Sequence, residues 1–103
     1  MPSSQIKSRL ELILERRHLP GLLDRLEVLG LQGWTVWEAE QGRGRHGRWY
    51  GAEFAGTSEH VMVLAICPRA TADQVVESLG PELERLAAVL LRSEVEVYRA
   101  EHF

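Results

Sequence analysis

The sequence has a single cysteine, Cys67, among its 103 residues, and one cysteine cannot form a disulfide within a chain. It also lacks an apolar run near the ~20 residues that a membrane-spanning helix needs, and its first residues do not resemble a secretory signal. These absences argue against a disulfide-stabilised secreted domain and against a membrane-spanning protein. We therefore expect a reduced, cytoplasmic setting, with any membrane contact made only through a partner.

Basic charge is scarce over the chain as a whole. The 12 Lys and Arg are outnumbered by 15 Asp and Glu, so the formal net charge is -3, which argues against nucleic-acid binding through a broad basic surface. The four histidines, the cysteine and the carboxylates show no spacing typical of a metal site. No nucleophile is paired with a base, so an enzyme is the least favoured function class.

What the sequence does contain is enough apolar material for one core. Hydrophobic residues make up 45% of the 103 positions, which suits one compact domain over residues 1–103 and is too little for two. Alternating or helically spaced apolar residues, bounded by glycines and prolines, predict six elements. They are a strand over 3–17, a helix over 19–29, strands over 34–39 and 59–68, a helix over 71–79 and a strand over 94–99.

Two details of the second half refine this prediction. Thr71 has the side chain of a helix-capping residue, and Gly80-Pro81 is expected to interrupt the helix that follows, because proline cannot donate to it. Residues 82–90 are then predicted to resume as a helical turn or two. Cys67, at the end of an apolar strand, is interpreted as a small buried hydrophobic residue rather than a nucleophile.

The order strand, helix, strand, strand, helix, strand is typical of the α+β, ferredoxin-like βαββαβ arrangement, with an antiparallel sheet and both helices on one face. Trp34 and Trp37 have opposite parity on one strand, and two helices cannot cover both sides of the sheet. We therefore expect the other sheet face to meet further copies of the chain.

Residues 41–51 place four glycines, three arginines and a histidine between two predicted strands. Closely spaced glycines let backbone N–H groups approach a ligand, and guanidinium groups bind phosphate or carboxylate through paired hydrogen bonds. Arg43, Arg45, His46 and Arg48 are therefore the candidate anion-binding residues. The alternative is a flexible, solvated hairpin loop whose arginines only confer solubility. Without ligand, the loop is not expected to be ordered.

Three segments, read in this order, resemble the PII family of trimeric signalling proteins. Residues 29–38 read Leu-Gly-Leu-Gln-Gly-Trp-Thr-Val-Trp-Glu, residues 42–45 read Gly-Arg-Gly-Arg, and residues 50–54 read Tyr-Gly-Ala-Glu-Phe. Residues 97–101 are similar to the last strand of the family. The resemblance covers nearly the whole chain.

The resemblance implies a homotrimer with adenine nucleotide sites in the clefts between subunits, and a ligand-responsive T-loop at about 42–58 that engages a partner. By position, the nucleotide-binding residues implied are Thr35, Gly42, Gly44, Arg45 and Ile66. Bicarbonate is a small planar anion that an arginine fork also suits, so the anion-binding residues Arg43, Arg45, His46 and Arg48 are candidates for it.

The chain departs from the family where typical members grip a polyphosphate with a glycine-rich turn and a lysine. Residues 86–94 lack such a turn, Glu94 is closest to the lysine position, and the chain reaches Phe103 without the basic residues that typical members carry downstream. Fewer cations disfavour ATP most, so AMP or ADP, or a cyclic nucleotide, is expected. This combination resembles PII-like proteins of the carbon concentrating mechanism, which include regulators of bicarbonate transporters and carboxysome-associated proteins.

Other functions remain open at this stage. The chain is also compatible with a cyclic-nucleotide-sensing PII-like regulator of a transporter, or with a trimer like the divalent-cation-tolerance proteins, which share the topology. Residues 48–54 faintly resemble the aromatic signature of RNA-recognition motifs, but they fall in the loop instead of on a central strand.

Overall fold

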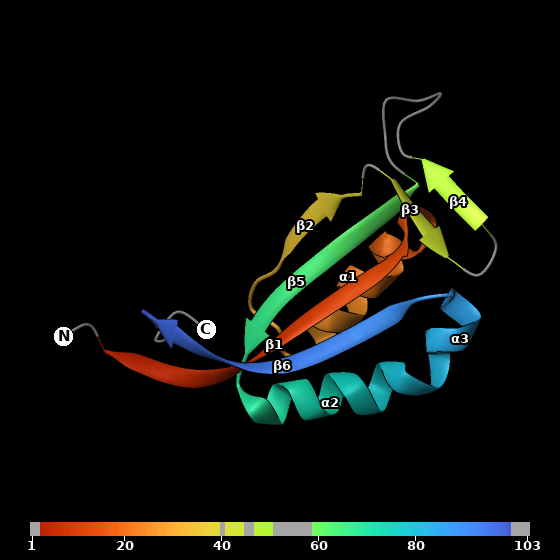
Figure 1. Cartoon of the computed structure of the whole chain (residues 1–103). Coiled ribbons are helices and arrows are strands. Elements are labelled where there is room, and N and C mark those ends of the chain that lie inside the picture. Colours follow the sequence, from red (N-terminus) through yellow and green to blue (C-terminus); the bar gives the residue numbers. More distant parts are fainter. Residues whose placement is uncertain (1–2, 40, 45–46, 51–58, 100–103) are drawn as a thin grey trace.

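The computed structural model describes residues 3–39, 41–44, 47–50 and 59–99, and for 41–44 and 47–50 it describes the backbone alone. Its main body is a four-stranded antiparallel sheet in the order β2-β5-β1-β6, with the helices against one face (Figure 1). The predicted ferredoxin-like α+β arrangement is confirmed. The sheet strands are β1 (Ser4–Glu15), β2 (Thr35–Glu38), β5 (His60–Cys67) and β6 (Val89–Tyr98).

The helical elements lie between these strands. Pro20 occupies the first turn of the first helix, where its missing N–H leaves no bond unmade, and Gly80-Pro81 ends the second helix in a 3-10 turn, both as predicted. The helical elements are η1 (Arg16–His18), α1 (Leu19–Val28), α2 (Arg69–Leu79), η2 (Gly80–Glu82) and α3 (Leu83–Leu86).

Two boundary predictions are wrong. Helix α2 begins at Arg69 with Pro68 at its N-cap, so Thr71 lies inside the helix and does not cap it. Helix α3 ends at Leu86, and β6 begins at Val89, five residues before the predicted start. The reason for the second error is tertiary: residues 89–91 pair with residues 11–13 of β1, and this pairing overrides the local apolar spacing.

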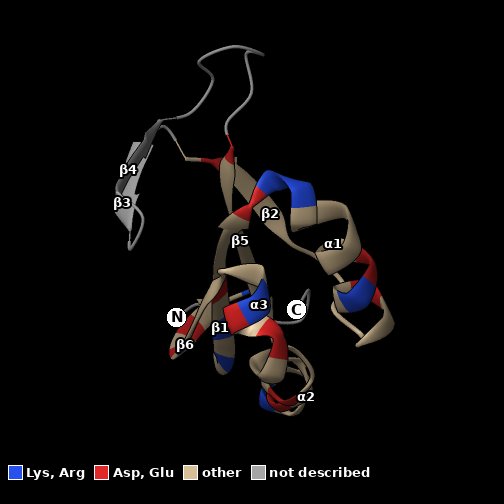
Figure 2. Ribbon diagram, turned by 90° about the vertical axis from the view of Figure 1, so that its right-hand side faces the viewer, with Lys and Arg blue, Asp and Glu red and all other residues tan. Residues whose placement is uncertain are grey.

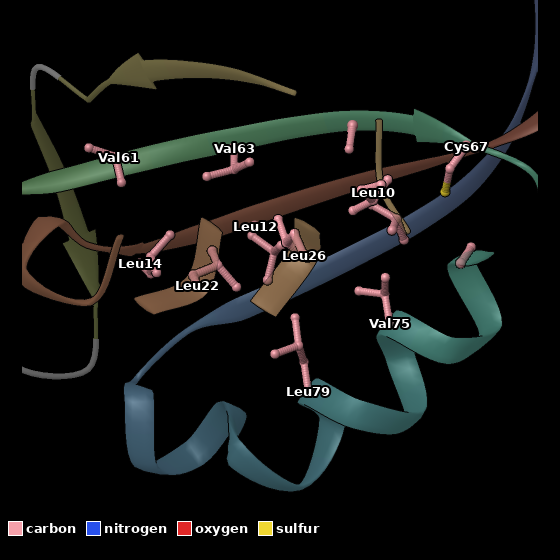
Figure 3. Close-up of a cluster of buried hydrophobic side chains, with 13 residues drawn as sticks. Leu10, Leu12, Leu14, Leu22, Leu26, Val61, Val63, Cys67, Val75 and Leu79 are labelled. Atoms are coloured by element: carbon pink, nitrogen blue, oxygen red, sulfur yellow. The ribbon is translucent and has the colours of Figure 1, made fainter. Parts of the chain in front are cut away.

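The core lies between the helices and one face of the sheet, as Figure 3 shows. Alternate residues of a strand face opposite sides, so Leu10, Leu12 and Leu14 of β1 are buried while the residues between them are partly exposed. Cys67 is 2% exposed and belongs to this cluster, as predicted. The other members are Leu22, Leu26, Leu31, Val61, Val63, Ala65, Ala72, Val75 and Leu79.

Figure 2 shows α1 and α2 on the same side of the sheet, which leaves the opposite side without helices. We call this side the open face. Its large apolar residues include Trp37, Val89 and Leu91, which are 47%, 50% and 49% exposed. Trp34 packs against the core instead, so the two tryptophans differ as their opposite parity predicts.

The arginine-rich segment forms a separate two-stranded sheet of β3 (Gln41–Gly44) and β4 (Gly47–Tyr50), shown in Figure 1. The backbones of these eight residues pair in an antiparallel register, so the segment contains a hairpin that was not among the six predicted elements. Arg45, His46 and residues 51–58, which belong to the predicted T-loop, lie outside the described residues.

Candidate functional site

The hairpin of β3 and β4 leaves the main sheet at the point where β2 ends and β5 begins. Its register places Gly42 opposite Trp49, Arg43 opposite Arg48, and Gly44 opposite Gly47. The two predicted arginines that the structure describes are thus brought to paired positions. Two glycines at one end of the ladder keep bulky side chains away from the backbone there.

The ends of the segment that contains the hairpin are tied to the sheet. The N–H of Ala39 donates to the carbonyl oxygen of His60 at 3.0 Å, which extends the pairing of β2 and β5 by one bond. The N–H of Arg16 donates to the carbonyl oxygen of Glu59 at 2.7 Å, and the Arg16 guanidinium forms an ion pair with Glu38. Arg16 therefore contacts both stems of segment 40–58, a role that the sequence did not indicate.

Thr35 and Ile66, the other two predicted site residues that are described, lie on the open face. Thr35 is paired with Leu64, and Ile66 is two residues farther along β5, so all three share one side of the sheet. Thr35 is exposed, and Leu64 and Ile66 are half-buried. Leu64 was not singled out from the sequence, although the strand alternation that marks Ile66 also marks Leu64.

Ile66 and the hairpin stem lie toward opposite ends of β5. Ile66 is six residues along β5 from His60, where the hairpin stem begins, which corresponds to roughly 20 Å of extended strand. A single small molecule therefore cannot touch Ile66 and the hairpin stem of the same chain. The structure brings Thr35 together with Ile66, and Arg43 with Arg48, and it places Ile66 far from the hairpin stem of its own chain.

The segment before β6 confirms that no glycine-rich phosphate turn is present there. It is a tight helix ending, with Ala87 at φ 51° and bonds from Ala87 to Glu84 and from Ala88 to Leu83. Glu94 pairs with Arg69 of α2, which places its carboxylate on the helix-covered side. Glu94 thus already has a cationic partner within its own chain, and the expectation that the chain disfavours ATP stays a prediction.

Reactive and metal-binding chemistry have little support among the described residues. Burial raises the pKa of the Cys67 thiol, so the thiol is held in its protonated, unreactive form. A hydrogen bond from Tyr98 to a Glu96 oxygen at 2.6 Å raises the pKa of the Tyr98 hydroxyl. Within residues 3–39 and 59–99, no three His, Cys, Asp or Glu side chains gather to hold a metal ion, and no described helix is long and apolar enough to span a membrane.

Solved structures with the same fold include two of CPII, a nitrogen regulatory PII-like protein from Thiomonas intermedia. One is bound to ADP, AMP and bicarbonate: its TM-score is 0.90 at 25% identity, over 100% of this chain and 98% of that chain. The other is bound to ADP and bicarbonate: its TM-score is 0.89 at 25% identity, over 100% and 99% of the two chains. A putative PII-like signalling protein from Thermus thermophilus shares the fold at 19% identity, with a TM-score of 0.78 over 98% of both chains.

A search of curated protein sequences found no match. The model of one protein family, described as nitrogen regulatory protein P-II, matches residues 7–102, which is nearly the whole chain. The chain therefore belongs to the P-II family, as its resemblance predicted.

Proposed function

We propose that this protein is a homotrimeric PII-like signalling protein that binds AMP or ADP, together with bicarbonate, in clefts between its subunits. The observation that carries the proposal is the separation of Ile66 from the stem of the arginine hairpin within one chain. Both groups have the chemistry of a nucleotide site, yet one small ligand can touch Ile66 and a hairpin stem only when these come from different copies. The similarity to CPII structures that hold ADP, AMP and bicarbonate supports the same ligands here.

The open face supports assembly. Large apolar residues on the two edge strands of this face, Trp37 on β2 and Val89 and Leu91 on β6, are about half exposed in the isolated chain. Between them, β5 contributes Met62, Leu64 and Ile66 to this face, while β1 contributes charged residues such as the Arg9–Glu11 ion pair. Exposed large apolar residues gathered on a sheet face without helices are typical of an interface. Members of this family are trimers, and packing three open faces around one axis buries this surface and brings the hairpin of one chain to the sheet end of another.

We assign the nucleotide to Thr35, Gly42, Gly44, Arg45 and Ile66. Thr35 offers a hydroxyl beside the apolar surface of Leu64 and Ile66, which suits an adenine ring. The glycines of β3 have no side chains, so a phosphate can approach the backbone of the hairpin closely.

Bicarbonate is assigned to the arginine hairpin, through Arg43, Arg45, His46 and Arg48. Positions 43 and 48 are directly paired, and like charges opposite each other destabilise an antiparallel ladder. A bound anion relieves that repulsion, so occupancy is expected to stabilise the hairpin. The ligand thereby changes the conformation of residues 42–58, the T-loop.

The regulated process is inorganic-carbon uptake or fixation, through a bicarbonate transporter or a carboxysome-linked partner that the T-loop contacts. The protein acts as a sensor in the cytoplasm and not as an enzyme. If nucleotide and bicarbonate occupy one cleft, each must change the affinity of the other by the same factor. That reciprocity is what makes the protein a carbon-status sensor.

The test is a thermal-shift screen of the full chain with AMP, ADP, ATP and cyclic AMP, each with and without bicarbonate. A ligand at a hundredfold excess over its dissociation constant stabilises the protein by about 2.7 kcal/mol. We expect AMP or ADP to raise the melting temperature, with a further rise on adding bicarbonate. The Arg43→Ala/Arg45→Ala variant should lose both rises, whereas Arg69→Ala, which removes an arginine on the helix-covered side, should keep them.

Undiminished shifts in Arg43→Ala/Arg45→Ala would remove the hairpin from the site. A larger shift with cyclic AMP than with AMP or ADP would favour the cyclic-nucleotide sensor instead. No shift with any of these nucleotides would contradict the proposed ligands and leave the family membership alone.

A further inference from the structure

On the helix-covered side, a cleft of about 250 Å³ opens between the start of α1 and the η2–α3 segment. It lies on the side of the sheet opposite Thr35 and Ile66, so it is separate from the proposed nucleotide site. Figure 2 shows charged residues on both α1 and α3. The cleft is lined by Arg17, His18, Gly21, Leu22, Arg25, Leu79, Glu82, Arg85 and Leu86.

The charge of this lining is unbalanced. Three arginines and one carboxylate face the cleft, in a chain whose overall formal charge is -3. The two oxygens of Glu82 are both engaged: Oε1 accepts a hydrogen bond from Arg85 at 2.7 Å, and Oε2 pairs with Arg25. Glu82 therefore neutralises one positive charge and leaves an excess of two in the lining.

The three arginines differ in how firmly they are held. Arg25 also donates to the carbonyl oxygen and the hydroxyl of Ser78, at 3.0 and 2.6 Å, so it is fixed at the back of the cleft. The Arg17 side chain is 72% exposed and reaches Glu15, which does not line the cleft, at 3.3 Å. The Arg85 side chain is 66% exposed. Arg17 and Arg85 can therefore reorient toward a ligand at little cost, because exposed ion pairs contribute little to stability.

We propose that this cleft is a second binding site, for a small organic anion that carries a phosphate or carboxylate group. Guanidinium groups bind both groups through paired, charge-assisted hydrogen bonds, and Arg17 and Arg85 offer such pairs from opposite walls. Leu22, Leu79 and Leu86 provide an apolar surface for the body of the ligand. The volume admits a small metabolite and is below the range of most cofactor sites.

The cleft is also next to the anchor of the hairpin segment. Arg17 and His18 belong to η1, and the first residue of that turn, Arg16, contacts Glu59 and Glu38 on the two stems. A ligand that draws Arg17 into the cleft acts on the residue beside this anchor. Occupancy of the cleft is therefore expected to change the affinity of the hairpin for its own ligand.

The experiment uses the full chain with Arg43→Ala/Arg45→Ala as background, so that the hairpin cannot account for anion binding. Inorganic phosphate and citrate are titrated separately by calorimetry at low ionic strength, which distinguishes the two anion classes. Adding Arg17→Gln/Arg85→Gln should weaken binding about tenfold to a hundredfold, since hydrogen bonds to charged groups are lost. The matched control, Arg69→Gln/Arg92→Gln, removes two arginines that pair with Glu94 and Asp73 elsewhere, and should leave binding unchanged.

A second variant tests the cleft without removing charge. Gly21 lines the cleft within α1, and a Cβ added there meets no atom within 4 Å, so Gly21→Leu should fold and fill the opening. We expect it to abolish binding of whichever anion the background protein binds. Equal affinities in the arginine variant and its control, unchanged binding in Gly21→Leu, or no saturable binding of either anion in the millimolar range would each overturn the proposal. Failure of these titrations would leave the nucleotide proposal untouched, because that proposal is tested with different residues and ligands.

Discussion

Replacing Gly30 by alanine is expected to destabilise the fold through its backbone conformation alone. Gly30 follows α1 at φ 99°, and its N–H donates to Glu27 at 3.1 Å while that of Leu31 donates to Leu26 at 3.0 Å. This pair of bonds is a Schellman motif, which requires a left-handed residue at the glycine position. A Cβ at Gly30 would meet no atom within 4 Å, so steric contact with the rest of the fold contributes nothing.

The magnitude follows from two opposing effects. A left-handed conformation costs an L-residue about 1–2 kcal/mol. Alanine also has fewer conformations than glycine in the unfolded chain, and this effect alone raises the free energy of unfolding by about 0.4–1 kcal/mol. We therefore expect Gly30→Ala to lower the free energy of unfolding by about 1 kcal/mol, since φ 99° lies beyond the usual left-handed range and favours the higher cost.

Ala87 provides the reverse experiment in the same molecule. It ends α3 at φ 51°, with bonds from Ala87 to Glu84 at 3.1 Å and from Ala88 to Leu83 at 2.9 Å, so it holds the equivalent position without being a glycine. Ala87→Gly removes the left-handed cost and should raise the free energy of unfolding by up to about 1 kcal/mol.

Both variants are measured by urea unfolding followed by circular dichroism, at one protein concentration because assembly affects the apparent stability. The midpoint should shift in opposite directions for the two variants with an unchanged slope. In thermal unfolding, a change of 1 kcal/mol corresponds to about 4–8 °C for a domain of this size. A Gly30→Ala protein as stable as the wild type, or shifts of the same sign in both variants, would refute the conformational reasoning.

Three further predictions concern the assembly of the subunits, the titration of Glu82 and the reactivity of Cys67. Trp37→Glu on the open face should give a monomer by light scattering and lose nucleotide binding. The control Val28→Glu, at an 87% exposed helix position, should remain trimeric and bind nucleotide. A trimeric Trp37→Glu protein would contradict the proposed interface. Hydrogen bonds from Arg85, and to a lesser extent from Arg25, lower the pKa of Glu82. The ionised Glu82 therefore stabilises the fold fully above the ordinary glutamate pKa of about 4.3, and this contribution is lost as the pH falls through the lowered pKa. If Glu82→Gln leaves the dependence of stability on acid pH unchanged, Glu82 does not make this contribution. Cys67 should resist alkylation in the native protein and react once urea unfolds it, and rapid native labelling would contradict its burial.

Much of the fold follows from short-range pattern. The alternation of Leu10, Leu12 and Leu14 marks a half-buried strand, and Pro20 and Pro81 mark helix boundaries that the structure keeps. The pattern fails for residues 86–91, an apolar run without alternation. Such a run is compatible with either a helix or a strand, and only its pairing with β1 decides the outcome.

The candidate site is predictable only in part, because the pairing register of the strands decides which of its residues share one side of the sheet. Thr35 and Ile66 were identified by resemblance, but their common side and their neighbour Leu64 become visible only through the pairing of β2 and β5. Glu94 shows the opposite case, since its pairing with Arg69 places it on the side away from the open face. The Arg25–Glu82 pair joins residues that are 57 positions apart, and no local pattern indicates such a contact.

The geometry of one chain makes assembly and ligand binding inseparable in the proposed function. The hairpin leaves one end of the sheet, Ile66 lies toward the other, and the open face runs between them. In the proposed trimer, burying that face against another copy brings unlike ends together, so we expect the ligand site to form only in the assembly. A monomeric Trp37→Glu protein therefore retains every candidate ligand residue and still lacks the site. Conversely, a nucleotide that bridges two chains must stabilise their association by the same free energy by which association strengthens its binding.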